Sequence, residues 1–99
     1  MTQEIRIGPG GHTGWHSHPG PVLVTVKEGS LPLIYADDTA CQGTSYVQGD
    51  SFVDRGDETV HIARASPFTG VVLWATYFVP GTPVTAPFRI DAADPQTGC

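Results

Sequence analysis

Three of the four histidines are spaced so that they could share one metal ion. His16 and His18 lie two residues apart, and alternate side chains of a strand share a face, so on a strand both rings point the same way, about 7 Å apart. His61 lies in a separate apolar segment that folding could bring opposite the pair. Imidazole is a common metal ligand. The spacing therefore suggests a three-histidine metal site.

The same residues also have a simpler interpretation that the spacing leaves open. His16 and His18 stand beside Pro and Gly and could form a solvated rim, while His61 could be a core histidine bonded to a backbone carbonyl. His12 precedes His16 by four residues but lies in a glycine-rich turn. It could be a fourth ligand, yet loops run over the surface, so we expect an exposed loop histidine.

The elements that must position these residues are short strands. Twelve Gly and nine Pro interrupt the chain, and no window sustains a helical apolar period over a dozen positions. The tail, 81–99, contains three prolines and should wrap the outside with little regular structure. We expect strands at 4–7, 13–18, 22–27, 31–35, 45–48, 51–54, 60–64 and 70–79. This pattern predicts an all-β sandwich or barrel, which closes to hide its edges.

Length and charge limit the classes of partner. Ninety-nine residues predict a single domain, 1–99, with a core at about 4–80 followed by the tail. Five Lys and Arg stand against ten Asp and Glu, and the basic residues are scattered. Because nucleic acids and anionic membranes attract clustered cations, we expect neither partner. No apolar stretch approaches the roughly 20 residues of a spanning helix.

The two cysteines are too few for a disulfide scaffold and form no C-x-x-C pair. A bond between Cys41 and Cys99 is the one intrachain disulfide possible, and it would tie down the tail. The first residues lack the apolar run of a signal peptide, which predicts a cytoplasmic protein, or a secreted one if a natural leader had been removed. Cytoplasmic thiols stay reduced, so we expect both cysteines to be free.

Two segments resemble the two motifs of the cupin family. Gly10, a five-residue gap, His16-Ser17-His18 and the later Gly29 resemble the first motif, and the run Gly14–Pro21 is similar to that of small bacterial cupins. The segment Gly49–Asp54, the turn at Gly56 and the run His61–Arg64 resemble the second. The resemblance covers about Gly8 to Pro80 and implies a cupin double-stranded β-helix, a jelly-roll barrel.

The family resemblance also implies which residues bind metal, and it shows where this sequence lacks residues of the family motifs. Carried over residue by residue, it implies His16, His18 and His61 as ligands. The glutamate that the family places a few positions after the histidine pair falls on Val22, or on the neighbouring Leu23, and neither can ligate. The motif-two asparagine position is Ala65, and the proline before the motif-two histidine is also missing.

Without the family glutamate, the sequence predicts a metal site whose protein ligands carry no charge. Three imidazoles with open positions suit Zn²⁺, Fe²⁺, Ni²⁺ or Cu²⁺ and do not suit Mg²⁺ or Ca²⁺. The alternative is an apolar barrel that has lost its metal and keeps vestigial histidines.

Three functions remain open, and one assembly is expected. The chain could be a metal-dependent enzyme of the dioxygenase, isomerase or cyclase type acting on a small molecule. It could instead be a non-catalytic module that binds a small ligand or a metal, or an inert structural barrel. Both faces of the segment Val71–Val79 are apolar, so a second layer, either the tail or a partner subunit, should cover it. We therefore expect a homodimer.

Overall fold

Short antiparallel strands make up the regular structure. The computed structural model describes residues 2–56, 59–78 and 89–99. The strands are β1 Thr2–Ile7, β2 His16–Ser17, β3 Val22–Glu28, β4 Ser30–Tyr35, β5 Thr44–Val47, β6 Ser51–Asp54, β7 His61–Ala63, β8 Val71–Tyr77 and β9 Ile90–Asp91. The predicted all-β class is confirmed. Across these described residues, no helix is long and apolar enough to cross a membrane.

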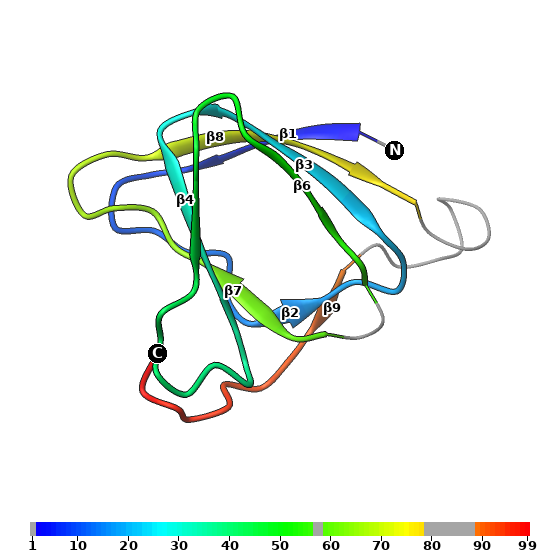
Figure 1. The fold of residues 1–99 in the computed structure, drawn as a ribbon, viewed down its shortest axis with the longest axis vertical. Coiled ribbons are helices and arrows are strands. Elements are labelled where there is room, and N and C mark those ends of the chain that lie inside the picture. Colours follow the sequence, from blue (N-terminus) through cyan, green and yellow to red (C-terminus); the bar gives the residue numbers. More distant parts are fainter. Residues whose placement is uncertain (1, 57–58, 79–88) are drawn as a thin grey trace.

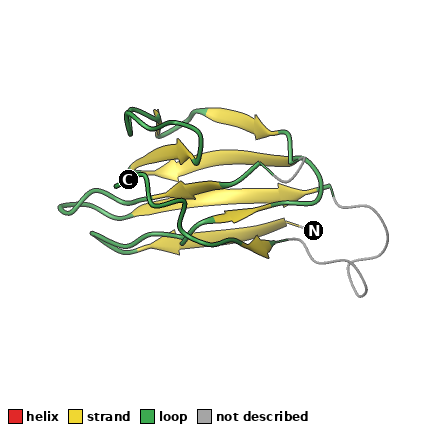
Figure 2. Cartoon of the chain, turned by 90° about the horizontal axis from the view of Figure 1, so that it is seen from below, coloured by secondary structure: helices red, strands yellow, loops and turns green. Residues whose placement is uncertain are grey.

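The strands form two sheets that face each other across the core (Figure 1). One sheet has the order β1-β8-β3-β6 and the other the order β5-β4-β7-β2-β9. From β5 onward, successive strands up to β8 alternate between the two sheets. Figure 2 shows the strands lying roughly alongside one another, with loops at both ends. This winding is that of a double-stranded β-helix, as predicted.

The core lies between the sheets because the inward face of each strand is apolar. On β3, Val22, Val24 and Val26 are buried while the intervening Leu23 is exposed, the period of two that a half-buried strand requires. The buried core is mostly aliphatic and comprises Ile7, Val22, Val24, Val26, Leu31, Leu33, Ala63, Ala65, Val71, Leu73, Ala75 and Tyr77.

The outer face of β8 is less covered than the sequence suggests. Trp74 is 42% exposed, and Phe78, just beyond the strand, is 58% exposed. The described part of the tail therefore does not bury this face. Val79, the last residue of the predicted strand, lies outside the described residues.

The tail contains a strand where none was predicted. β9 pairs with β2, with Asp91 opposite His16 and Ile90 opposite Ser17, and the Ala92 amide donates to the Trp15 carbonyl at 3.1 Å. The prediction of an irregular tail is wrong at these residues. Among the described strands, β7 is the other neighbour of β2, and β9 pairs with the second edge of β2.

The expectation of free thiols is also wrong. Cys41 and Cys99 form a disulfide, with 5.4 Å between their Cα atoms. The Arg64 guanidinium donates to the Cys99 carbonyl and so holds the chain end beside the 38–43 loop. The expectation rested on the redox state of a compartment, whereas the pairing follows from three-dimensional proximity that the sequence does not contain.

Candidate metal centre

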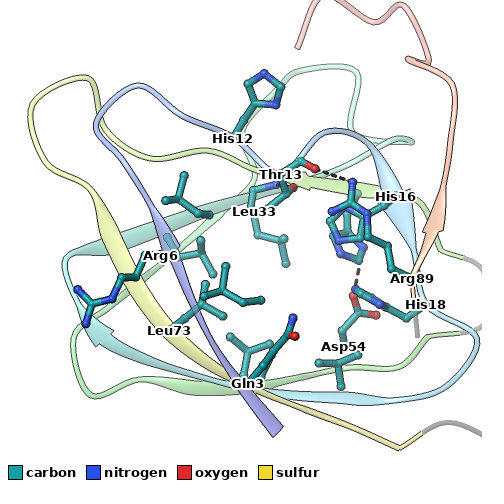
Figure 3. A pocket seen from close by; sticks show the side chains of 18 of the residues that line it. Gln3, Arg6, His12, Thr13, His16, His18, Leu33, Asp54, Leu73 and Arg89 are labelled. Carbon is teal, nitrogen blue, oxygen red and sulfur yellow. Dashed lines mark hydrogen bonds and ion pairs between the residues drawn. The ribbon is translucent and has the colours of Figure 1, made fainter. Parts of the chain in front are cut away.

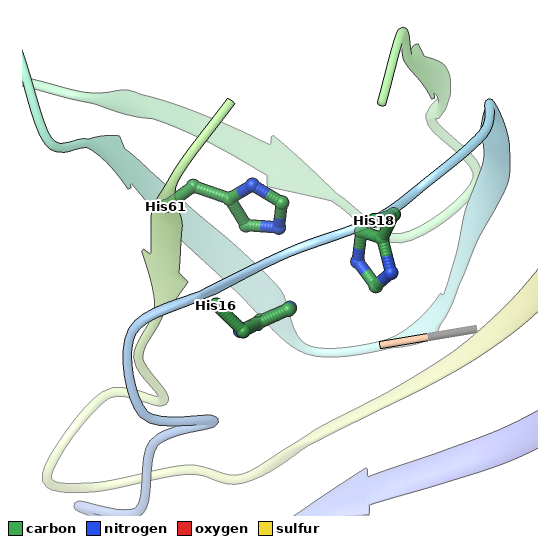
Figure 4. A group of neighbouring side chains, drawn as sticks. All are labelled: His16, His18 and His61. Atoms are coloured by element: carbon green, nitrogen blue, oxygen red, sulfur yellow. The ribbon is translucent and has the colours of Figure 1, made fainter. Parts of the chain in front are cut away.

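Three histidine rings meet inside the barrel (Figure 4). His16, His18 and His61 are all buried, with 4–7% of each residue exposed. Their ring centroids lie 4.9 Å apart for His16 and His18, 4.4 Å for His16 and His61, and 5.3 Å for His18 and His61. One ring nitrogen of each residue lies within 4.8 Å of the others. The tertiary structure thus brings together the three residues singled out by spacing.

β2 positions His16 and is shorter than predicted. His16 stands opposite His61 in the β2–β7 pair. The predicted strand at 13–18 is regular only at His16–Ser17, because Gly14 has a left-handed backbone conformation (φ 73°), which turns the chain just before His16. The Gly14 carbonyl, 2.9 Å away, accepts a hydrogen bond from His16 Nδ1. Its Nε2 is therefore the nitrogen left to bind a metal.

A buried carboxylate orients His61. Asp54 is 3% exposed, and its Oδ2 lies 3.1 Å from His61 Nδ1, which is also 3.1 Å from the Thr59 carbonyl. Both neighbours are acceptors, so Nδ1 carries the proton and Nε2 is unprotonated. A carboxylate behind a ligating histidine fixes the ring and raises its basicity. In the sequence, Asp54 stands only as the end of a strand and of the segment that resembles the second motif, and no local signal assigns it this role.

Gly56 explains why Asp54 can reach His61. The Gly56 amide donates to Asp54 Oδ1 at 2.9 Å, which engages the second carboxylate oxygen. Gly56 has φ 81°, and a Cβ there would lie 2.5 Å from the carbonyl carbon of Gly20. Only glycine fits this backbone at such a close approach. The turn after β6 is thereby packed against the loop that follows His18.

Val22 is the residue that occupies the expected glutamate position on the inner face. It is 2% exposed and lines the cavity, whereas Leu23 points outward and is 39% exposed. In the β3–β6 pair Val22 stands directly opposite Asp54. Opposed residues of antiparallel strands share a face, with Cβ atoms about 5 Å apart. The carboxylate missing from β3 therefore has a counterpart on the neighbouring strand, and that counterpart contacts a histidine.

Burial favours the neutral form of two of the three rings. It lowers the pKa of His16 from 6.5 to about 4. Burial also lowers the pKa of His61, against the opposing pull of the Asp54 carboxylate. Metal binding requires neutral imidazole, so these two ligands are ready to bind at neutral pH.

The three rings open onto a cavity of about 520 Å³ (Figure 3). Aliphatic side chains are the largest group in its lining. Arg89, Tyr77 and Gln3 also contribute, with Gln3 Nε2 donating to the Tyr77 hydroxyl at 3.0 Å. His12 is exposed, and Figure 3 shows its ring pointing away from the other histidines. The structure therefore does not bring it into the group.

The donor set fits a transition metal. Zinc–nitrogen bonds of about 2.1 Å place tetrahedral ligand nitrogens ~3.4 Å apart. Three nitrogens within 4.8 Å of one another reach this spacing when each shifts by about 1 Å or less. Neutral nitrogen donors suit Zn²⁺, Fe²⁺, Ni²⁺ or Cu²⁺ and disfavour Mg²⁺ and Ca²⁺.

Comparison with known proteins supports the fold. No family model and no curated protein matches the chain. A cupin-like protein from Thermotoga maritima matches with a TM-score of 0.67 and 24% identity, covering 75% of this chain and 53% of that one. An RmlC-like cupin from Shewanella frigidimarina matches with a TM-score of 0.65 and 24% identity, covering 87% and 70%.

The polyketide cyclase RemF from Streptomyces resistomycificus is also similar in structure. Its TM-score is 0.64 at 22% identity, covering 76% of this chain and 51% of the cyclase. The chain spans between 51% and 62% of the length of the first solved structures that it matches. Similarity at this level of identity shows a shared fold.

Proposed function

We propose that this chain, which has the cupin fold, binds one divalent transition-metal ion through His16, His18 and His61 and presents it to a small molecule in the cavity. The observation that carries the proposal is the convergence of three buried imidazoles at one end of that cavity. Surface histidines would be exposed and dispersed, whereas these rings are at most 7% exposed.

The residues around the site prepare it for an ion. The Gly14 carbonyl and the Asp54 carboxylate hold Nδ1 of His16 and His61, so that Nε2 of each ring remains available. Burial favours the neutral form of the His16 and His61 imidazoles. A bound ion would supply Lewis-acid or redox chemistry to a ligand oxygen.

We favour an enzyme of the dioxygenase, isomerase or cyclase type. The structurally similar RemF is a polyketide cyclase, and three protein ligands leave positions for a substrate.

One observation favours the alternative of a non-catalytic ligand-binding module. Among the described residues that line the cavity, Asp54 is the one carboxylate, and both of its oxygens are engaged by His61 and Gly56. No spare carboxylate there could act as a general base.

Metal analysis of the purified protein tests the proposal. We expect about one equivalent of transition metal in the wild type and none in the double variant His16→Ala/His61→Ala. His12→Ala is the matched control, because its ring lies outside the group, and should retain the metal. Wild-type protein that takes up no metal from a divalent-ion mixture, or a double variant that keeps a full equivalent, would contradict the proposal.

A further inference from the structure

The histidine end of the cavity is polar, and the next layer along β3 is mostly apolar. Val22 stands opposite both Asp54 and Tyr77, at the end where the histidines meet. Val24, two residues further along β3, stands opposite Phe52 and Ala75. Gln3, opposite Ala75 on β1, is the polar residue of this second layer, and its amide donates to the Tyr77 hydroxyl.

Two small side chains leave space in the apolar layer. Ala63 follows His61 by two residues on β7, and Ala75 precedes Tyr77 by two on β8. Alternation puts each alanine on the same face as its polar neighbour, and both line the cavity. A larger residue at either position would occupy the space next to the histidines. The two alanines therefore leave room for the apolar part of a ligand whose polar group lies at the histidine end.

The charge at the polar end favours an anionic head. Arg89 lines the cavity, its side chain is 37% exposed, and it therefore lies at the opening. A hydrogen bond to the Thr13 carbonyl at 2.6 Å (Figure 3) and an ion pair with Asp91 at 2.8 Å hold it there. A divalent ion would add two positive charges, while Asp91 compensates Arg89 and Asp54, behind His61, offsets one charge of the ion. One positive charge is then left at the histidine end, beside Arg89.

We infer that the cavity binds a small carboxylic acid with an aliphatic or aromatic body, its carboxylate directed toward Arg89 and the histidine end and its body lying between Ala63 and Ala75. The inference rests on the proposed metal site and names the chemical class of the molecule that the site receives. A cavity of about 520 Å³ is in the range that holds small organic ligands.

Calorimetric titration of zinc-loaded protein with 3-phenylpropanoate and with its neutral amide tests the anionic head. We expect the acid to bind at least about tenfold more tightly, since a charge-assisted hydrogen bond is worth that much. Arg89→Gln should remove most of the preference. Arg6→Gln is the matched control, because Arg6 also lines the cavity but its side chain is 70% exposed, against 37% for Arg89. Equal binding of acid and amide, or equal effects of the two variants, would overturn the inference.

A second pair of variants tests the apolar body. Ala75→Leu should fill the space and weaken 3-phenylpropanoate binding at least about tenfold while the zinc content is unchanged. Thr76→Leu, on the outer face of the same strand, should leave the affinity unchanged. Zinc content and the melting temperature show whether each variant is folded. A folded Ala75→Leu protein that binds the acid like the wild type would place the ligand elsewhere and overturn the inference.

Zinc measured on the same samples separates the two proposals. Stoichiometric zinc without a preference for the acid overturns the inference and leaves the metal site intact. Protein that takes up no zinc contradicts the proposed function instead. In that case the titrations are repeated on the metal-free protein. A preference for the acid over the amide that Arg89→Gln removes would support the carboxylic-acid ligand. Equal binding of acid and amide would overturn it.

Discussion

At the scale of single residues, the carboxylate near the histidines lies on β6 and not at the glutamate position that the first cupin motif places on β3. Val22 removes an acidic ligand from β3, and Asp54, directly opposite on β6, contacts His61 instead. A carboxylate in this position orients a ligand without binding the ion itself, so the proposed site keeps three neutral donors. The arrangement makes Asp54 a positioning residue.

Asp54→Asn should weaken metal binding about 10- to 100-fold, because the amide orients His61 without contributing a negative charge. Competition titration with a chromogenic chelator measures the dissociation constant. Glu28→Gln is the matched control, since it removes one negative charge from an exposed position at the end of β3. Equal affinities in the two variants would show that Asp54 has no such role.

The lowered histidine pKa values predict acid sensitivity of the metal-free protein. His16 titrates near 6.5 in the unfolded chain and at about 4 when folded, and the pKa of His61 is lowered in the same direction. The unfolded state therefore binds more protons between these values, so the free energy of unfolding is fully present above about pH 6.5 and falls as the pH decreases toward 4. Urea denaturation at pH 7 and pH 5 measures the difference. His16→Gln should reduce it, and an unchanged free energy in the wild type would contradict the prediction.

At the scale of elements, the tail completes the sheet that holds the site. β9 pairs with the strand that carries His16, Arg89 bonds to the Thr13 carbonyl, and the Cys41–Cys99 disulfide anchors the end of the chain. These tail contacts extend from Arg89 at the cavity opening to Cys41 in the 38–43 loop. Disulfides persist in oxidising conditions, so this anchor depends on the redox state around the protein.

Replacing both cysteines, as Cys41→Ser/Cys99→Ser, should lower the free energy of unfolding by about 4 kcal/mol, the entropy of closing a loop of this length. The cysteines are 58 residues apart in sequence. Amide hydrogen exchange should accelerate at 89–99 while β3 and β8 remain protected, because the tail loses its anchor. Wild type under reducing conditions is the control and should match the variant. Uniform acceleration through β3 and β8 would show that the disulfide supports the whole barrel instead.

At the scale of the whole molecule, one sheet presents an apolar outer face. Leu23 and Val53 stand opposite each other on β3 and β6, 39% and 61% exposed, and Trp74 on β8 is 42% exposed. Lys27 Nζ lies 5.5 Å from the Trp74 ring centre. The described residues leave this face uncovered, and an exposed apolar face of this kind marks an interaction site.

We therefore predict a homodimer that buries this face. Light scattering at micromolar concentration should give twice the mass of the chain, and Val53→Asp should give a monomer because it places a charge in the interface. Asp50→Asn, in the exposed turn before β6, is the control and should remain a dimer. A monomeric wild type would contradict the prediction.

Local patterns in the sequence determined much of this protein. Alternating apolar residues and turn glycines predicted the eight strands before the tail to within a few residues, except around His16, and the motif resemblance predicted the cupin fold that the structure confirms. The spacing of His16 and His18, together with the local motif around His61, selected the residues that meet in the barrel. These features depend on near neighbours in the chain, which is why they can be read from one sequence.

Tertiary structure alone decided the surroundings of the histidines and the position of the tail, because these features depend on strand register and on contacts between distant segments. The pairing of β3 with β6 put Asp54 opposite Val22, and the pairing of β2 with β9 placed the tail beside His16. The disulfide between Cys41 and Cys99 and the uncovered outer face of β8 follow from the same long-range packing. No local pattern encodes which strands become neighbours, so the sequence left the orientation of His61 and the anchoring of the tail undetermined.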